Sequence, residues 1–262
     1  MLQSVNSDHD NHYTRGQSNS IESLVAARND GKKHLLLAAS GSVATIKIPV
    51  IVQALARYEG QLSIRIVLTE PATHFLNGQS DEQPTVSSLL ILPNVDAVYR
   101  DQDEWGPQSW RRGASILHIE LRRWADMLVV APLSANTLAK IVNGMADNLL
   151  TSVIRAWDTD SSIDMRKKII LVAPAMNSAM WRNPITNKQI RVLSDEWGVK
   201  EDLGMAGGAR PITGWFQVLT PISKALACGD VGGAMAAVPT ICEAIEQRLN
   251  LGSSARESSL VG

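Results

Sequence analysis

Short apolar runs alternate with helical patterns along most of the chain, and this alternation restricts the folds that it can adopt. Residues 34–40, 63–69 and 126–132, and a further run that begins at residue 167, have the length and apolar content of buried strands. Apolar residues between these runs recur at helical spacing. Continuous apolar strands are typical of parallel sheets with both faces covered. The sequence therefore predicts an α/β fold, a parallel sheet with helices on both faces.

The predicted domain lies between two polar ends. Residues 1–31 are rich in Ser, Asn, Asp and His, so we expect a disordered N-terminal segment. Residues 32–249 carry the strand and helix patterns, and residues 250–262 predict a flexible C-terminal tail. Within the domain, residues 200–237 show repeated glycines and turn signals in place of a periodic pattern. We expect a long loop there that acts as a lid or a binding segment.

Charge and composition exclude several classes of function. A formal net charge of -1 gives no overall attraction to nucleic acid or to an anionic membrane. No run approaches the roughly 20 apolar residues that span a bilayer, and the N-terminus matches neither a secretory nor a transit signal. We therefore expect a cytoplasmic protein that binds no nucleic acid and no membrane. The two cysteines, Cys228 and Cys242, lie in no Cys/His cluster, so we expect no metal.

Two segments and one side chain follow predicted strands at the edge where open parallel sheets bind ligands. SGSVAT, residues 40–45, offers Gly41 for close backbone approach and a helix start that favours phosphate. SANT, residues 134–137, offers hydroxyl, amide and free N–H groups to an anion. Both segments could instead be an ordinary turn and cap, and the first lacks the GxGxxG fingerprint. Thr69 ends the second strand and could add a hydroxyl.

A third segment, APAMNSAMW, follows the strand predicted at residues 168–173. Asn177 could hold a carboxylate or an amide by hydrogen bonds. Met176, Met180 and Trp181 could form an apolar wall beside it, or they could be ordinary core residues. The segment therefore leaves a binding role and a packing role open.

His118 and Cys228 are candidates for proton transfer. Histidine can accept a proton near neutral pH, although a His between Leu and Ile often has a structural role. A thiol can donate a proton, and Cys228 lies in the Gly-rich segment, whereas Cys242 fits a helical core pattern. Arg122 and Arg123 could attract an anionic substrate or form a solvated charged face.

Four segments in this order resemble the homo-oligomeric flavin-containing cysteine decarboxylase family, specifically its phosphopantothenoylcysteine decarboxylases and the fungal halotolerance proteins. They are HIELRRWADMLVVAPLSANTLAKI, GMADNLLTSVIRAWD, PAMNSAMW and LACGD, and the resemblance covers roughly residues 33–248. It implies a Rossmann-like flavoprotein fold, assembled as a trimer with FMN at subunit interfaces. It also implies decarboxylation of 4'-phosphopantothenoylcysteine to 4'-phosphopantetheine in coenzyme A biosynthesis, which makes residues 32–249 a flavoprotein decarboxylase domain.

The same resemblance implies roles for individual residues. His118 matches the active-site base and Cys228 the proton donor. The implied substrate-binding residues are Asn177, Arg123, Met180 and Ala227. The implied FMN contacts are Gly41, Ser42, Val43, Thr69, Ser134, Ala135, Asn136, Thr137 and Ala175. This chemistry would oxidise the substrate thiol to a thioaldehyde, with two electrons going to FMN, and release carbon dioxide. The same two electrons would then return from the flavin to the remaining enethiolate while Cys228 supplies a proton.

Two departures from the family pattern concern the Gly-rich segment. The family commonly has ACGDxGxGAMAEP, whereas this chain has ACGDVGGAMAAVP. One residue is missing near Gly232, where the chain has GG in place of GxG, and Ala237 stands where Glu is usual. This difference predicts a lid that closes differently. The segment EDLGMAGGARPITGWFQVLTP is also longer than in compact members and is similar to fungal relatives.

Other functions and assemblies are compatible with these segments. Some fungal relatives inhibit protein phosphatase 1, but they have a longer N-terminal extension and an acidic C-terminal tail. Peptidyl-cysteine decarboxylases lack the reducing Cys, and flavin prenyltransferases lack PxMNxxMW, so Cys228 argues against both. Because His118, Asn177 and Cys228 all occur in one chain, we expect a homotrimer. A heterotrimer with paralogues, in which these residues are divided between subunits, is the alternative.

Overall fold

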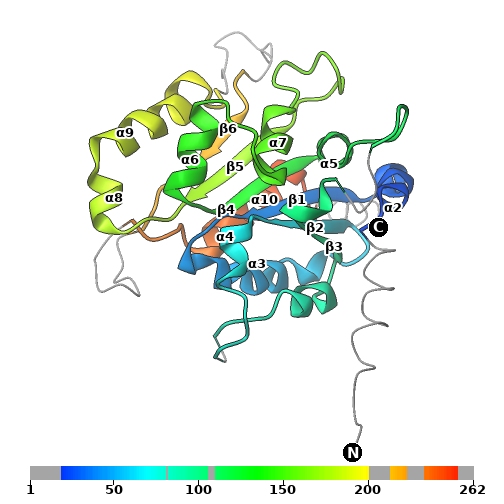
Figure 1. The fold of residues 1–262 in the computed structure, drawn as a ribbon, viewed down its shortest axis with the longest axis horizontal. Helices are drawn as coiled ribbons and strands as arrows, with labels where there is room; N and C mark the ends of the chain where they lie inside the picture. The colour runs from blue at the N-terminus through cyan, green and yellow to red at the C-terminus, as the bar shows by residue number, and fades with distance from the viewer. Residues whose placement is uncertain (1–18, 81, 106–109, 201–212, 223–232, 253–262) are drawn as a thin grey trace, which may run out of the picture.

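The centre of the fold is a six-stranded sheet with the strand order β3-β2-β1-β4-β5-β6, in which every neighbouring pair is parallel (Figure 1). The computed structural model describes residues 19–80, 82–105, 110–200, 213–222 and 233–252. The strands are β1 (Lys33–Ala39), β2 (Leu62–Leu68), β3 (Val95–Arg100), β4 (Met127–Leu133), β5 (Ile169–Pro174) and β6 (Phe216–Val218). The prediction of an α/β fold around a parallel sheet is confirmed.

Alternate residues of β1 contact two different layers of helices, because successive side chains of a strand point to opposite faces. Leu35 and Leu37 belong to one hydrophobic cluster, and Leu36 and Ala38 belong to the other. The first cluster contains side chains of α3 (Ile48–Ala54) and α10 (Val238–Leu249). The second contains side chains of α2 (Ile21–Ala26), α5 (Leu117–Trp124), α6 (Ala135–Val142) and α7 (Leu149–Arg155). Both faces of the sheet are therefore covered, as predicted.

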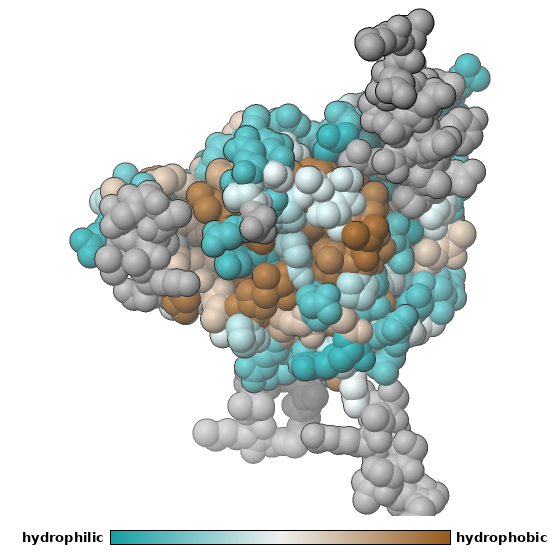
Figure 2. All heavy atoms as spheres, turned by 90° about the horizontal axis from the view of Figure 1, so that it is seen from below, coloured by the Kyte–Doolittle hydropathy of each residue, from teal (hydrophilic) through white to brown (hydrophobic). Residues whose placement is uncertain are grey.

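Three further α-helices among the described residues follow the carboxyl ends of β2 and β5. Helix α4 (Glu70–Thr73) follows β2, and α8 (Ser178–Arg182) and α9 (Pro184–Arg191) follow β5. Hydrophobic side chains also reach the surface, and Figure 2 shows them gathered in clusters between hydrophilic residues on one face of the molecule. None of the helices in the described ranges is long and apolar enough to cross a membrane.

The structure differs from the sequence prediction at three places. Helix α2 lies inside the N-terminal segment that we expected to be disordered, and its Leu24 is fully buried. Strand β6 lies inside the expected loop 200–237 and pairs with β5. His118 is in helix α5, whereas the sequence placed it only before a strand. The elements α2 and β6 are short and depend on contacts with distant parts of the chain, so local patterns did not reveal them.

The burial of Leu24 gives a test of the N-terminal boundary. Leu24→Ala should lower the free energy of unfolding by about 2–4 kcal/mol, because truncation leaves a cavity in the second cluster. Val25, which is 41% exposed on the same helix, is the matched control, and Val25→Ala should have little effect. Urea denaturation measures both variants. Equal unfolding midpoints for Leu24→Ala and the wild type would show that α2 does not belong to the folded domain.

Candidate functional site

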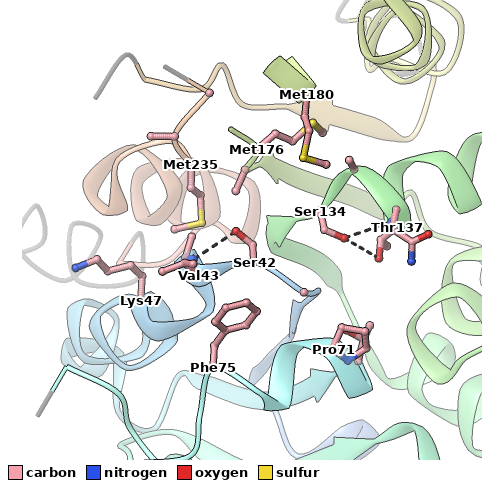
Figure 3. A pocket seen from close by; sticks show the side chains of 18 of the residues that line it. Ser42, Val43, Lys47, Pro71, Phe75, Ser134, Thr137, Met176, Met180 and Met235 are labelled. Atoms are coloured by element: carbon pink, nitrogen blue, oxygen red, sulfur yellow. Dashed lines mark hydrogen bonds between the residues drawn. The ribbon is translucent and has the colours of Figure 1, made fainter. Parts of the chain in front are cut away.

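A cavity of about 900 Å³ lies at the carboxyl ends of β1, β2, β4 and β5 (Figure 3). Parallel strands end at the same edge of a sheet, so loops distant in sequence meet there. The nine residues implied as FMN contacts all line this cavity: Gly41, Ser42, Val43, Thr69, Ser134, Ala135, Asn136, Thr137 and Ala175. Two of the implied substrate-binding residues, Asn177 and Met180, line it too.

Ser40 joins the first two segments of the cavity wall. Its hydroxyl donates a hydrogen bond to the Pro132 carbonyl at 3.1 Å and accepts one from the Ser134 N–H at 2.8 Å. The turn after β1 is thereby fixed to the turn after β4. Gly41 lies between this contact and α4, and a Cβ atom at Gly41 would lie 2.6 Å from the Pro71 Cβ. Glycine is required at position 41 because a Cβ atom there would clash with the Pro71 ring.

The first residues of two helices, which follow β1 and β4, line the cavity next to these turns. The Ser42 Oγ accepts the Ala44 N–H at 3.4 Å at the start of the 3-10 helix Val43–Lys47. The Ser134 Oγ accepts the Thr137 N–H at 3.3 Å and caps α6. The capping role that the sequence left open for Ser134 is therefore present. Free N–H groups at the start of α6 still favour an anion in the cavity.

Thr69 provides a polar group without a described partner. Its side chain is buried, and its Oγ1 makes no hydrogen bond among the residues that the structure describes. A buried hydroxyl without a hydrogen bond is costly, and native proteins rarely leave one in this state. Because Thr69 also lines the cavity, a polar ligand group is the natural partner for this hydroxyl.

The segment after β5 forms the opposite wall. The Asn177 Oδ1 accepts the Met180 N–H at 2.8 Å and caps α8. Met176 is buried and Met180 is 45% exposed, and both side chains lie at the cavity (Figure 3). Trp181, which the sequence grouped with them, packs against the second hydrophobic cluster instead. The apolar wall therefore comes from the two methionines.

The backbone at residue 233 closes the wall behind Met176. The Met176 N–H donates to the Gly233 carbonyl at 3.0 Å. Gly233 has a φ of 70°, and a Cβ atom there would lie 2.5 Å from the Met176 carbonyl oxygen. Glycine is therefore required at this position too. This contact brings the following residues, including Met235, to the cavity.

Two predicted site residues do not reach the cavity, and two lie outside the described residues. The His118 Nδ1 is 2.5 Å from the Glu104 Oε1, and His118 is absent from the described lining of the cavity. Arg123 is also absent from the lining, and it forms an ion pair with Glu120 at 3.0 Å. Within one chain, the structure therefore does not bring His118 and Asn177 together. Ala227 and Cys228 fall in the range 223–232, which is not described.

Several lining residues were missed by the sequence prediction. Pro71 and Phe75 follow β2, so the rule that selected Thr69 could have identified them. Asp101 follows β3 and accepts backbone N–H groups of Glu70 at 2.8 Å and Leu149 at 3.2 Å. Burial raises the pKa of the Asp101 carboxyl, and these two hydrogen bonds oppose that rise. No sequence motif identified Asp101, because its partners start two helices distant in the chain.

A salt bridge lies at the cavity beside these residues. The Lys140 Nζ is 2.6 Å from the Asp147 Oδ2, and both residues line the cavity. Asp147 belongs to the segment GMADN, which the resemblance included without a role for this residue. The hydrogen bond from Lys140 lowers the pKa of the Asp147 carboxyl, so this carboxyl is ionised at neutral pH.

Comparison with known proteins defines the family. The profile described as Flavoprotein matches residues 24–250. The chain belongs to the Flavoprotein family. It is similar to a phosphopantothenoylcysteine decarboxylase of Arabidopsis thaliana, with 42% identity over 211 residues, which are 80% of this chain and 81% of that protein.

Two longer relatives contain a similar region. A "Probable thymidylate synthase" of Schizosaccharomyces pombe is 41% identical over 85% of this chain, and the "Coenzyme A biosynthesis protein 3" of Saccharomyces cerevisiae is 37% identical over 87% of it. The chain spans about a third of the length of these relatives, 30% of the first and 36% of the second.

Solved structures share both fold and sequence with this chain. A mutant PPC decarboxylase complexed with pantothenoylaminoethenethiol has a TM-score of 0.63 and 40% identity, covering 82% of this chain and 97% of that one. "The FMN binding protein AtHal3" has a TM-score of 0.61 and 40% identity, covering 82% of this chain and 96% of that one. The predicted Rossmann-like flavoprotein fold is therefore confirmed.

The thiol of Cys242 should be unreactive in the folded protein, and this can be tested directly. It is buried in α10, and burial raises the pKa of its thiol to about 11. Only a very small fraction is then thiolate at pH 8, and the thiolate is the reactive form. Iodoacetamide at pH 8 should leave Cys242 unmodified in the native protein and modify it after unfolding, as peptide mass spectrometry can measure. Modification of the native protein at the unfolded rate would contradict the assignment.

Proposed function

We propose that this protein is an FMN-dependent decarboxylase that converts 4'-phosphopantothenoylcysteine to 4'-phosphopantetheine, a step of coenzyme A biosynthesis. The observation that carries the proposal is the cavity, which combines polar strand ends with Asn177 in one site. Its volume of about 900 Å³ falls in the range of cofactor pockets. The similarity to a plant decarboxylase, to a solved PPC decarboxylase and to an FMN-binding protein supports both the reaction and the cofactor.

The residues of the cavity fit an FMN molecule. The starts of the 3-10 helix Val43–Lys47 and of α6 offer N–H groups to its phosphate. The unpartnered Thr69 hydroxyl can bond a polar atom of the cofactor, and Gly41 lets the backbone approach it. When bound, FMN supplies the two-electron redox chemistry that amino-acid side chains lack.

The remaining roles belong to side chains of this protein. The Asn177 side chain holds the substrate carboxylate, and Met176 and Met180 exclude water from the reacting carbon. His118 accepts a proton from the substrate, and Cys228 returns a proton to the product. Arg123 and Ala227 complete the proposed substrate contacts. The protein orients the substrate and moves protons in this scheme.

A homotrimer accounts for the position of His118. His118 is absent from the described lining of the cavity in its own chain, so in this assembly a neighbouring subunit brings it to the site. Val43, Met180 and Ile222 line the cavity and are 47%, 45% and 39% exposed in the single chain. Large apolar side chains at a cavity mouth favour a covering partner. A heterotrimer with paralogues uses the same geometry and is the alternative assembly.

The proposed function is tested on the purified protein. It should be yellow from bound FMN, assemble as a trimer, and release carbon dioxide from 4'-phosphopantothenoylcysteine with formation of 4'-phosphopantetheine. Mass spectrometry of the products measures the reaction. A trimeric, flavin-loaded protein that leaves this substrate unchanged would overturn the proposal. Location in the cytoplasm stays a prediction from the sequence, and inhibition of protein phosphatase 1 stays the alternative function.

The Thr69 hydroxyl provides a test of the cofactor site. Thr69→Val keeps the side-chain shape and should weaken FMN binding about tenfold, because one polar contact is lost. The flavin-free variant should be as stable as the wild type, since the lost hydroxyl has no described partner. Thr73→Val on α4 is the matched control, because Thr73 does not line the cavity. Titration of flavin fluorescence measures both, and equal affinity for Thr69→Val and wild type would contradict the site.

Mixed subunits test the shared site. The variants His118→Asn and Asn177→Asp should each be inactive alone. The Asp side chain in Asn177→Asp can still accept the Met180 N–H, so the start of α8 stays capped. Subunits refolded together should recover up to about a quarter of wild-type activity, because about one site in four combines an intact histidine and an intact asparagine from different chains. No recovery in verified mixed trimers would show that both residues must come from one chain.

A further inference from the structure

One contact of a buried carboxylate that the proposed reaction leaves unexplained is the pair formed by Glu104 and His118. The Glu104 Oε1 is 2.5 Å from the His118 Nδ1, and the two side chains are 6% and 21% exposed. A carboxylate this well buried needs a partner, and the imidazole is that partner among the described residues. The second carboxylate oxygen, Oε2, is buried and makes no hydrogen bond within the described part of the chain. Among the described residues, the Glu104 carboxylate therefore hydrogen-bonds through Oε1 to the His118 Nδ1.

The backbone fixes Glu104 three residues after Asp101, which lines the cavity. Glu104 follows the 3-10 helix Asp101–Asp103, and its N–H donates to the Asp101 carbonyl at 3.3 Å. The Asp103 carboxylate accepts the Arg100 N–H at 2.7 Å and caps this helix. The Asp101 carboxylate binds the first N–H groups of α4 and α7 and lines the cavity. One short helix therefore connects the wall of the cavity to the partner of His118.

The pairing decides which nitrogen of His118 can act as a base. A carboxylate only accepts hydrogen bonds, so a neutral imidazole facing it carries its proton on Nδ1. The lone pair then lies on Nε2, at the opposite side of the ring. When Nε2 takes a proton, the charge that forms on the ring is next to the Glu104 carboxylate, which stabilises it.

We propose that Glu104 is the positioning residue of the reaction: it holds His118 in the Nδ1–H tautomer, so that Nε2 exchanges the proton with the substrate. The choice of substrate rests on the function proposed above, whereas the tautomer does not. A buried carboxylate with one unpaired oxygen adds little to stability. Its contribution is instead to orient the base and to complement its charge.

Kinetics of Glu104 variants test the proposal. Glu104→Gln keeps the shape but removes the charge, and Glu104→Leu also removes the acceptor. We expect kcat to fall about 10–100-fold in Glu104→Gln and further in Glu104→Leu, with KM within about twofold, as is usual when the partner of a functional histidine is lost. FMN content and trimer mass should match the wild type. Gln102→Leu, at an exposed position of the same turn, is the matched control and should keep full activity.

Nitrogen spectra of the histidines test the pairing without any activity assay. The chain has 5 histidines, and loss of one signal set in His118→Asn assigns residue 118. At a pH where the ring is neutral, the wild type should show a protonated Nδ1 and an unprotonated Nε2. Glu104→Leu should return the ring to the Nε2–H form that free imidazole prefers. An Nε2–H tautomer in the wild type, or an unchanged tautomer in Glu104→Leu, would overturn the proposal.

The two kinds of failure are distinguishable. A wild-type protein that shows the Nδ1–H tautomer but does not decarboxylate 4'-phosphopantothenoylcysteine would contradict the proposed function and leave the pairing in place. An active wild type whose Glu104→Leu variant keeps its kcat would contradict the positioning role alone. Loss of activity together with loss of FMN or of the trimer in Glu104→Gln would show a structural role and would also overturn the proposal.

Discussion

The parallel register of the sheet is the constraint on which the site depends. Because β1 pairs parallel with both β2 and β4, and β4 with β5, the loops after these strands meet at one edge. The Ser40 hydroxyl then ties two of the loops together, from β1 and from β4. Close backbone approaches at Gly41 and Gly233 complete the wall. The cavity is thus a consequence of strand direction, and the side chains at the strand ends give it its chemistry.

The described lining of the cavity in one chain holds only part of the proposed chemistry. Thr69 and Asn177 line the cavity, whereas His118 contacts Glu104 and is absent from the described lining. The exposed apolar residues at the mouth, such as Val43 and Met180, give a physical reason for a second subunit to cover it. In this account, assembly brings the base to the cofactor. Activity would then depend on subunit contacts as well as on the fold.

Most of the fold and of the cavity wall could be predicted from the sequence, because both follow from local patterns. Buried strands read as apolar runs, and the small polar residues after them mark the ligand edge, as for Ser42 and Ser134. Helix α2, strand β6 and the role of Asp101 could not be predicted in this way. Each depends on contacts between distant segments, such as the N–H groups of Glu70 and Leu149 at the Asp101 carboxylate. The Glu104–His118 pair belongs to the same group, since no motif marks Glu104.

A structure of the flavin-loaded assembly tests the central claim most directly. The account predicts FMN in the cavity, with its phosphate at the starts of α6 and of the 3-10 helix Val43–Lys47. It predicts the ring system between Asn177 of one chain and the imidazole of residue 118 from a neighbouring chain, with Nε2 facing the ring. A flavin bound elsewhere, or an assembly in which every residue 118 imidazole is remote from every flavin, would contradict it.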